Sequence, residues 1–587
     1  MDAPDAFGDD EDAALRYAIA LSLQEAGGTS SQQPIELSSD EDENDLEKAP
    51  KLRSSAKGSG DSSSKQPLKD TLLKDQPGAP QQPTPTAPSS FAALGLDRKK
   101  MEEERLARLR KRKATESEPD GQDRRRRPKL DNETPRNLGV EAASRSLPYP
   151  KGIVKKTWAA GFPRGDDIKI EEVLQKDELE LAIISSFQWD DSWMFSKIDF
   201  TKTNVVCIAF ASGEAQQKEM KANVPGWAKV KFCFPPMGPT GNMHSKLQLL
   251  KYPGYMRVVV PTGNFVPYDW GENGVIENMV FLIDLPRIDN PELQSSDNLG
   301  PFGDELCYFL RAQGVGENTV NSLKHYDFSE ANRYRFVHSI GTSHVGDKWQ
   351  RTGYCGLGRA VKSLGLDTTE NIEVDYVVSS LGSLNMDLLS ALYYAAQGDN
   401  GMKEYGMRTA RGGKRKEPTQ AQLDLKDKFR IYFPSRDTVM KSCGGRNAAG
   451  TICVQSRWWD SATFPRELIR DCKNVRPGLL IHSKVMMVRH SHSGESKAAY
   501  AYVGSANLSE SAWGRLVKER GTGNPKLTCR NWECGVIVPV SSQDSNQPGS
   551  QHSSPSDFNG IIPVPMEVPG EAYGATSSKR PWLFLED

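Results

Sequence analysis

The segments GNMHSKLQLL (residues 241–250) and LLIHSKVMMV (residues 479–488) contain the same His-Ser-Lys tripeptide. The chain has only eight histidines, and these two tripeptides lie 238 residues apart. An apolar run of the kind that forms a buried strand flanks each one. One His-x-Lys is a common accident of sequence and one histidine in an apolar strand is usually structural, but a duplicated unit is not explained that way. The repeat therefore predicts a site built twice.

The two tripeptides are predicted to present the same side chains to one place. On a strand, residues i and i+2 point to the same face. His244 and Lys246 should therefore project together, as should His482 and Lys484, while the intervening serines face away. Each half of the chain would then deliver one imidazole and one ammonium group.

An asparagine follows each tripeptide after a further apolar run and a turn of small residues. Asn264 lies in RVVVPTGNFVP and Asn507 in AYAYVGSANLS. Lysines and asparagine amides suit the negative charge of a phosphoryl transition state. One neutral histidine can attack phosphorus, while a protonated one donates its proton to the leaving oxygen and then activates water. This chemistry predicts a bell-shaped pH profile, and we expect neither a metal nor another cofactor.

These residues resemble the repeated unit of the phospholipase D superfamily, in which His-x-Lys is commonly followed by an aspartate after four residues. Here Lys251 and Arg489 occupy that place. The loss resembles one branch, the tyrosyl-DNA phosphodiesterases that act on DNA 3′ ends. The resemblance extends over most of residues 150–587, in HSKLQLLKYPGYMRVVVPTGNFVPYDW, VSSLGSL, LLIHSKVMM, VGSANLSESAWG, NWECGV and RPWLF.

The resemblance implies a role for each member of the repeated set. His244 would be the nucleophile, and His482 the general acid and then the general base. The phosphoryl oxygens would be bound by Lys246, Lys484, Asn264 and Asn507. The VSSLGSL segment matches a stretch of the family that contacts DNA, where small residues allow close approach of the backbone to phosphate. The DNA-contacting residues implied are Ser380, Leu381, Gly382, Ser383 and Ser509.

The family also orients its two histidines. Glu533 matches a glutamate that supports the second histidine, and a carboxylate there would raise its basicity. For the first histidine we expect Glu277, with Glu272 as the alternative. Where the family has Thr-Ser-Asn in the first half, this chain has glycine at position 263.

The fold class predicted is α/β. Apolar runs with strand spacing alternate with helical stretches such as ELELAIISSFQW (178–189) and GDELCYFLRAQG (303–314) from about residue 150 onward. By the resemblance, residues 151–350 and 351–587 would form two pseudo-symmetric phospholipase D-like domains. Each would be a mixed β-sheet flanked by helices, and the site would lie where they meet.

Residues 1–150 are predicted to form a disordered regulatory tail, because Ser, Pro, Gln and Lys dominate much of it. The formal net charge is −2, but residues 1–48 are acidic and 105–129 strongly basic. The nine cysteines form no CxxC pair, which fits a reducing compartment. We expect no signal peptide and no membrane association, since no apolar run approaches the length that spans a bilayer, and we expect a monomer.

Three tail segments resemble binding or targeting motifs. Residues 11–26 resemble a ubiquitin-interacting helix, with contacts through Leu15, Ala18, Ile19 and Ser22; the alternative is an isolated amphipathic helix. Residues 34–43, with Ile35 and Leu37, resemble a SUMO-interacting motif. Residues 108–129 resemble a bipartite nuclear localisation signal, or a basic arm that grips phosphate. Both interpretations of the basic segment predict a nuclear protein.

The substrate implied is single- or double-stranded DNA whose 3′ phosphate is joined to the tyrosine of a peptide, as left by a type IB topoisomerase. Four aromatic residues are candidates for stacking on bases, although each is more often part of a core: Trp458, Trp459, Tyr252 and Tyr354. Two alternatives stay open. The chain could be another phosphodiesterase of the superfamily, acting on lipid or plain nucleic acid, or a non-catalytic scaffold that binds ubiquitin and SUMO.

Overall fold

The computed structural model describes residues 147–573 and 579–583, apart from 239, 291, 293, 411–419, 493–494 and 541–554. The three predicted tail motifs lie outside these residues. In the part of the chain that is described, no helix is both long enough and apolar enough to cross a membrane.

The first half contains an eight-stranded mixed sheet in the order β2-β1-β9-β7-β6-β3-β4-β5. Its strands are β1 (Ile153–Thr157), β2 (Asp167–Ile168), β3 (Leu181–Ser185), β4 (Asn204–Ile208), β5 (Val230–Cys233), β6 (Leu247–Lys251), β7 (Tyr255–Pro261) and β9 (Met279–Pro286). Strands β3, β4 and β5 run parallel, whereas β6, β7 and β9 are antiparallel to their neighbours.

The second half contains a seven-stranded sheet in the order β10-β20-β17-β16-β12-β13-β14. Its strands are β10 (Arg335–Ser339), β12 (Ile372–Val377), β13 (Phe429–Phe433), β14 (Ile469–Asp471), β16 (Val485–His492), β17 (Glu495–Gly504) and β20 (Glu533–Pro539). The outer strand β10 begins before residue 351, so this sheet starts earlier in the chain than the expected domain boundary.

The two sheets repeat one arrangement. The series β1-β9-β7-β6-β3-β4-β5 corresponds strand for strand to β10-β20-β17-β16-β12-β13-β14. Pairing directions also agree: four antiparallel contacts are followed by two parallel ones in each series. This correspondence confirms the predicted pair of similar α/β halves, although their sequences differ greatly.

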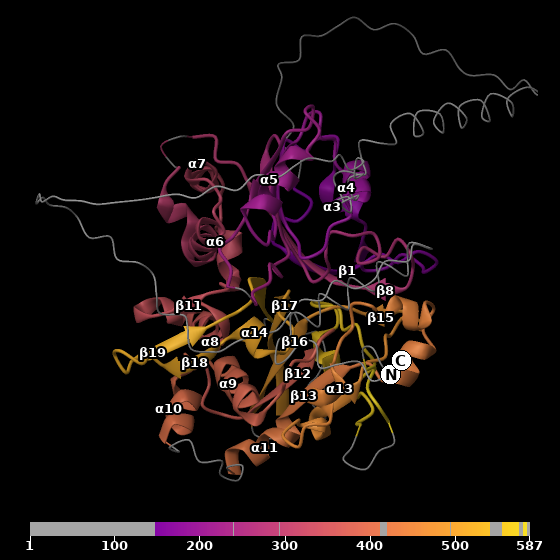
Figure 1. Cartoon of the computed structure of the whole chain (residues 1–587), viewed down its shortest axis with the longest axis vertical. Coiled ribbons are helices and arrows are strands. Elements are labelled where there is room, and N and C mark those ends of the chain that lie inside the picture. Colours follow the sequence, from indigo (N-terminus) through magenta and orange to yellow (C-terminus); the bar gives the residue numbers. More distant parts are fainter. Residues whose placement is uncertain are drawn as a thin grey trace, which may run out of the picture.

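Helices flank both sheets (Figure 1). The first half has α3 (Ile170–Leu174), α4 (Asp191–Lys197), α5 (Glu214–Ala222), α6 (Gly300–Ala312) and α7 (Glu317–Asn321). The second has α8 (Gly353–Ser363), α9 (Met386–Ala396), α10 (Met402–Ala410), α11 (Gln420–Lys428), α12 (Arg436–Met440), α13 (Ser456–Trp459) and α14 (Glu510–Trp513). The helix expected at 303–314 is α6. The helix expected at 178–189 is wrong, because its β-branched, buried LAIIS segment forms β3.

A shared core joins the halves. Alternate residues of β7 face opposite ways: Val258 and Val260 belong to a cluster with Val485 and Val503 of the second sheet, whereas Val259 packs under α3 and α4. The sheets therefore pack against each other through their inner faces, and the central strands are apolar on both sides.

Two smaller sheets complete the structure. Strands β8 (Ile276–Glu277) and β15 (Leu480–Ile481) pair in parallel and so link the first half to the second. Strands β11 (Ser343–His344), β18 (Arg515–Lys518) and β19 (Pro525–Thr528) form a three-stranded sheet in the second half. The β8–β15 pair matters for the site, because β15 ends immediately before His482.

Candidate active site

The two His-Ser-Lys tripeptides lie just before strands β6 and β16, not inside them as predicted. The reason is that each tripeptide pairs with the opposite half of the molecule before its own sheet begins. The backbone N–H of His244 donates to the carbonyl of Trp532 (3.0 Å), and that of His482 donates to the carbonyl of Glu277 (2.9 Å). Each histidine is thus positioned by both halves, and both are buried.

The lysine of each tripeptide turns back toward its own histidine. Lys246 Nζ donates to the carbonyl of His244 (2.8 Å), and Lys484 Nζ to the carbonyl of His482 (2.6 Å). Burial lowers the pKa of Lys246 to about 8. Burial, and then the charge of Lys246, holds the pKa of Lys484 well below its usual range. Two ammonium groups from opposite halves therefore act on each other, which makes the site attractive to an anion.

The structure corrects the expected role of Glu533. Its Oε2 lies 2.9 Å from Nδ1 of His244, the first histidine, not His482. Ser505 Oγ donates to the same oxygen (2.5 Å), and Asn531 Nδ2 donates to Oε1 (3.2 Å). A carboxylate at Nδ1 fixes the proton there, so the lone pair of His244 is on Nε2. Burial lowers the pKa of His244, and Glu533 opposes that shift.

The second histidine faces an aspartate that sequence reasoning missed. His482 Nδ1 lies 3.0 Å from Asp269 Oδ1, at an ion-pair distance but off the direction of a good hydrogen bond. Asp269 also accepts from the backbone N–H of Asn264 (2.6 Å) and from Asn278 Nδ2 (3.0 Å). Burial would raise the pKa of Asp269, but His482 and Lys484 lower it to about 2. Burial lowers the pKa of His482 to about 4 despite this carboxylate.

Neither glutamate expected to orient His244 does so. Glu277 forms an ion pair with Arg476, whose Nε lies 2.5 Å from Oε2, and it contributes to the site only through its backbone. Glu272 pairs with Lys197 (2.6 Å). The sequence offered several acidic residues after Asn264, and nothing in their spacing identified which one the fold turns inward.

The supports of the two histidines are related but not identical. Thr262 Oγ1 accepts from the backbone N–H that follows Asn278 (2.9 Å), and Ser505 Oγ accepts from the one that follows Glu533 (3.0 Å). Asn278 and Glu533 are therefore counterparts. The first half has the amide of Asn278 where the second half has the carboxylate of Glu533. Asp269 supplies the negative charge that His482 would otherwise lack beside it.

The glycine at position 263 makes room for this support. A Cβ there would lie 2.8 Å from Cγ of Asn278 and 3.0 Å from Cβ of Asp269. The serine that the family pattern has at this position would therefore displace one of them. The departure from the pattern and the presence of Asp269 beside His482 are parts of one local arrangement.

The two asparagines are held differently. Asn507 Oδ1 accepts from the backbone N–H groups of Ser379 (3.2 Å) and Ser380 (3.1 Å), and from the Ser379 hydroxyl (3.2 Å). Its Nδ2 is left to donate elsewhere. Asn264 Nδ2 instead donates to Gln188 Oε1 (3.3 Å).

The predicted DNA-contacting segment runs beside Asn507. Leu381 and Gly382 are buried and Ser383 is exposed. Ser380 Oγ is buried and has no hydrogen-bond partner among the described residues. An unsatisfied buried hydroxyl next to Asn507 is a donor available to a ligand.

The other predicted contacts have structural partners. Ser509 caps helix α14 by accepting from the backbone N–H of Ala512 (3.1 Å). The four aromatic stacking candidates are buried, with exposed fractions of 0–7%: Tyr252, Tyr354, Trp458 and Trp459. They belong to the core, as the alternative interpretation expected.

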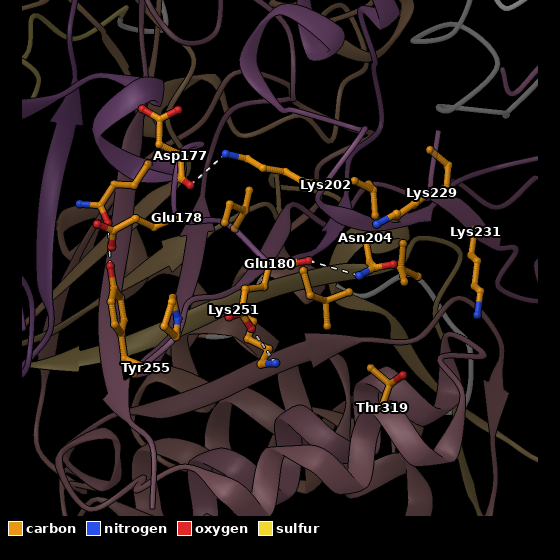
Figure 2. Close-up of a pocket in the computed structure, with 18 of the residues that line it drawn as sticks. Asp177, Glu178, Glu180, Lys202, Asn204, Lys229, Lys231, Lys251, Tyr255 and Thr319 are labelled. Atoms are coloured by element: carbon orange, nitrogen blue, oxygen red, sulfur yellow. Dashed lines mark hydrogen bonds and ion pairs between the residues drawn. The ribbon is translucent and has the colours of Figure 1, made fainter. Parts of the chain in front are cut away.

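An open groove of about 1990 Å³ lies away from this site (Figure 2). It is lined by Lys251 at the end of β6 and Tyr255 at the start of β7, whereas His244 precedes β6 and Asn264 follows β7. Acidic and basic side chains are mixed along it. The groove therefore lies at the opposite ends of these strands from His244 and Asn264, so the volume of a cavity does not identify the active site here. No group of three or more His, Cys, Asp or Glu side chains suited to a metal occurs among the described residues.

Comparisons with known proteins agree with this architecture. The family model described as tyrosyl-DNA phosphodiesterase matches residues 153–574, and that of the ubiquitin interaction motif matches residues 10–26. The tail motif predicted at 11–26 is thereby confirmed, although its structure lies outside the described residues.

Two curated relatives are similar in sequence. Tyrosyl-DNA phosphodiesterase 1 of Arabidopsis thaliana is 24% identical over 387 residues, which are 63% of this chain and 58% of the relative's own length. A probable tyrosyl-DNA phosphodiesterase of Caenorhabditis elegans is 24% identical over 363 residues, 58% of this chain and 67% of the relative.

Solved structures show the fold. The yeast tyrosyl-DNA phosphodiesterase superposes with a TM-score of 0.53 at 17% identity, over 74% of this chain and 99% of the yeast chain. A histidine-to-asparagine mutant of the yeast protein gives 0.53 at 18%, over 74% and 100%. Because the family model extends over most of the described residues, membership is established: the chain belongs to the tyrosyl-DNA phosphodiesterase family.

Proposed function

We propose that this protein hydrolyses the phosphodiester bond between a DNA 3′ phosphate and a tyrosine, through a covalent phosphohistidine and without a metal ion. The observation that supports this most strongly is the pairing of each histidine with a carboxylate. Glu533 and Asp269 each face an Nδ1 atom, at 2.9 and 3.0 Å. Both Nε2 atoms are then left for one phosphorus atom, with two lysines and two asparagines around it.

In the first step, Nε2 of His244 attacks phosphorus and forms a P–N bond. The P–O bond to tyrosine breaks, and the phenolic oxygen takes the proton from Nε2 of His482. His244 becomes cationic as it bonds to phosphorus, and Glu533 stabilises that charge at Nδ1. The lysines and asparagines hold the equatorial oxygens, on which charge accumulates.

In the second step, His482, now neutral, removes a proton from water at Nε2 while the water oxygen attacks phosphorus. The P–N bond breaks, and His244 returns to its neutral form with its proton on Nδ1. The products are a DNA 3′ phosphate and a free tyrosyl peptide. Since the two halves present matching groups, attack and departure take place on opposite sides of phosphorus.

The protonation states follow from charge. Burial and two lysines favour the neutral form of both histidines at pH 7. A phosphodiester brings one negative charge among these groups, and a nearby opposite charge raises the pKa of a base. Substrate binding would therefore favour protonation of His482, whose Nδ1 already faces Asp269. His244 would stay unprotonated on Nε2, because that atom contacts phosphorus.

The test is turnover of a 3′-phosphotyrosyl oligonucleotide with EDTA present. We expect wild type to release tyrosine, and His244→Ala to release essentially none. A 5′-phosphotyrosyl oligonucleotide, plain DNA and a phosphatidylcholine vesicle serve as comparison substrates. Cleavage of the vesicle or of plain DNA, with the 3′-phosphotyrosyl bond intact, would favour another branch of the superfamily. Cleavage of none would favour the non-catalytic scaffold.

The contacts to the DNA strand are part of the same proposal. Ser380, Leu381, Gly382, Ser383 and Ser509 lie on segments next to Asn507, so the strand 5′ to the scissile phosphate would pass there. Support comes from the unpartnered hydroxyl of Ser380. Ser380→Ala should raise KM for the oligonucleotide with little change in kcat.

The tail would recruit the enzyme. The ubiquitin interaction motif at residues 10–26 implies binding to ubiquitin, and we assign the contacts to Leu15, Ala18, Ile19 and Ser22. Ala18→Arg should abolish ubiquitin pulldown and leave oligonucleotide turnover unchanged. Unchanged pulldown would contradict the assignment.

Two further tail functions rest on sequence alone. The segment with Ile35 and Leu37 would bind SUMO, and the basic clusters within 108–129 would direct the protein to the nucleus. Type IB topoisomerase adducts tagged with ubiquitin or SUMO would then be the targets. Deleting residues 1–60 should spare oligonucleotide turnover but lower survival under a topoisomerase poison; equal survival would refute this recruitment.

A further inference from the structure

We propose that Gln188 is a positioning residue for Asn264, so that this amide presents its N–H to the phosphoryl group; the inference deepens the proposed function and rests on it. Gln188 lies in the short connection between β3 and α4 and is 8% exposed. Its Oε1 accepts from Asn264 Nδ2 (3.3 Å) and from the hydroxyl of Tyr268 (2.6 Å). Gln188 therefore links Tyr268 to the side-chain amide of Asn264, which we propose binds phosphate.

The connection that carries Gln188 is fastened to the turn that carries Asn264. Ser186 Oγ accepts from the backbone N–H of Phe265 (2.9 Å) and donates to the carbonyl of Gln188 (2.5 Å). Trp189 and Phe265 form a parallel bridge. Because both segments are tied together on either side of the amide contact, the Gln188 side chain has little freedom to move relative to Asn264.

The second half explains why such a residue is needed. There, Asn507 Oδ1 is fixed by donors from Ser379 and Ser380, so only Nδ2 can face the substrate. No such donors reach Asn264 among the described residues: its Oδ1 is buried without a hydrogen-bond partner, as is Nε2 of Gln188. An amide without a fixed partner can present either its oxygen or its nitrogen, and an oxygen facing a phosphoryl oxygen would repel it.

Gln188 can hold Asn264 in either of the two orientations that their side-chain amides can take together. As described, it accepts one hydrogen of Asn264 Nδ2 and leaves the second for the phosphoryl oxygen. With both amides turned over, Gln188 Nε2 donates to Asn264 Oδ1, and both Nδ2 hydrogens are free, as in Asn507. In each case Gln188 fixes the Asn264 amide and leaves at least one of its N–H groups free for the phosphate. Alanine at position 188 would remove the constraint and keep the Asn264 side chain.

The test is a double-mutant cycle between positions 188 and 264, read by single-turnover cleavage of the 3′-phosphotyrosyl oligonucleotide. We expect Gln188→Ala to lower the cleavage rate about 10- to 50-fold in the wild-type background, with KM nearly unchanged. In the Asn264→Ala background, the same change should have less than a twofold effect. Equal factors in the two backgrounds would overturn the proposal, because they would indicate an effect that does not pass through Asn264.

A matched pair of variants separates positioning from general disruption. Gln175 also accepts from a tyrosine hydroxyl, that of Tyr255 (2.6 Å), at the distant groove. Gln175→Ala should leave the cleavage rate unchanged, whereas Tyr268→Phe, which removes only the second partner of Gln188, should lower it by a few fold. A similar loss in Gln175→Ala would mean that the rate reports the stability of the first half.

Binding of orthovanadate, a tetrahedral phosphate analogue that becomes pentacoordinate when a nucleophile bonds to vanadium, gives a second readout that needs no turnover. Gln188→Ala should weaken vanadate binding about tenfold in the wild-type background and not in Asn264→Ala. If wild type cleaves no 3′-phosphotyrosyl bond, the proposed function fails, and the vanadate cycle still decides the role of Gln188. An equal loss of vanadate affinity in both backgrounds overturns it.

Discussion

Two carboxylates at the site give the two histidines different neighbours, and this difference supports the different roles that we propose for the histidines. Glu533 is fully hydrogen-bonded through Ser505 and Asn531, so it acts as a rigid partner for His244. Asp269 is held by a backbone N–H and by Asn278, and it faces His482 at ion-pair distance. The first arrangement suits a nucleophile and the second suits a proton donor.

Removing these carboxylates one at a time should affect different steps. Glu533→Gln should slow formation of the covalent intermediate about 100-fold, because the cationic His244 loses its counter-charge. Asp269→Asn should instead prolong the life of the intermediate, since His482 becomes a poorer base. Rapid-quench measurement of adduct formation and decay distinguishes the two. An Asp269→Asn variant whose adduct forms slowly and decays normally would contradict the assignment.

The pH dependence of adduct formation by the His482→Ala variant, in which no general acid titrates, should reflect the lowered pKa of Lys246. An amine with a pKa of about 8 loses its charge well below the usual 10.5, so activity should fall as the pH rises through about 8. Toward acid, His244 must stay unprotonated on Nε2, and its lowered pKa should preserve activity below pH 6.5. Lys246→Arg, whose charge persists, should move the alkaline limb upward. If the alkaline limb of the profile does not move in this variant, another group is responsible for it.

At the scale of elements, the repeat could be predicted and the supports could not. His-Ser-Lys and the following asparagines are local patterns, so sequence located both sets and the apolar strands beside them. The positions of Glu533 and Asp269 depend on which loop crosses to the other half, a long-range property that spacing does not encode. The helix expected at 178–189 was wrong for a different reason: a short apolar run in a buried strand can contain residues that also suit a helix.

A substitution in the turn between β7 and β8 would test whether Gly263 makes room for Asn278 and Asp269. Gly263→Ser should displace Asn278 or Asp269, because the added Cβ would lie within 3.0 Å of both. We expect the covalent intermediate to decay about tenfold more slowly, with its formation less affected. Gly254→Ser, where a Cβ meets nothing within 4 Å, is the control. Identical decay in both variants would mean that this turn does not govern His482.

On the scale of the whole molecule, the halves are joined by a shared core and by the β8–β15 pair. Sequence predicted two similar halves meeting at the site. It could not predict that each histidine would hydrogen-bond to the backbone of the opposite half, at Glu277 and Trp532. The consequence is that the catalytic geometry and the association of the halves depend on the same contacts.

The Arg476–Glu277 ion pair should therefore stabilise the whole molecule. Glu277 is fully buried and Arg476 is 13% exposed. Arg476→Ala would leave a buried carboxylate without its arginine and should lower the free energy of unfolding by about 3 kcal/mol, as measured by urea denaturation. Adding Glu277→Gln should recover part of the loss, because the remaining group is neutral. A loss of the same size in the double variant would place the effect elsewhere.

The most direct measurement of the central claim is the identity of the residue that becomes bonded to DNA. His482→Ala protein is mixed with a 3′-phosphotyrosyl oligonucleotide, quenched, digested, and sequenced by mass spectrometry. Tyrosine phenolate can leave without a proton donor, but water attack is slow without the base, so an adduct should accumulate. We predict that the nucleotide is attached to the imidazole of His244. No adduct, or one on a different residue, would contradict the two-histidine mechanism.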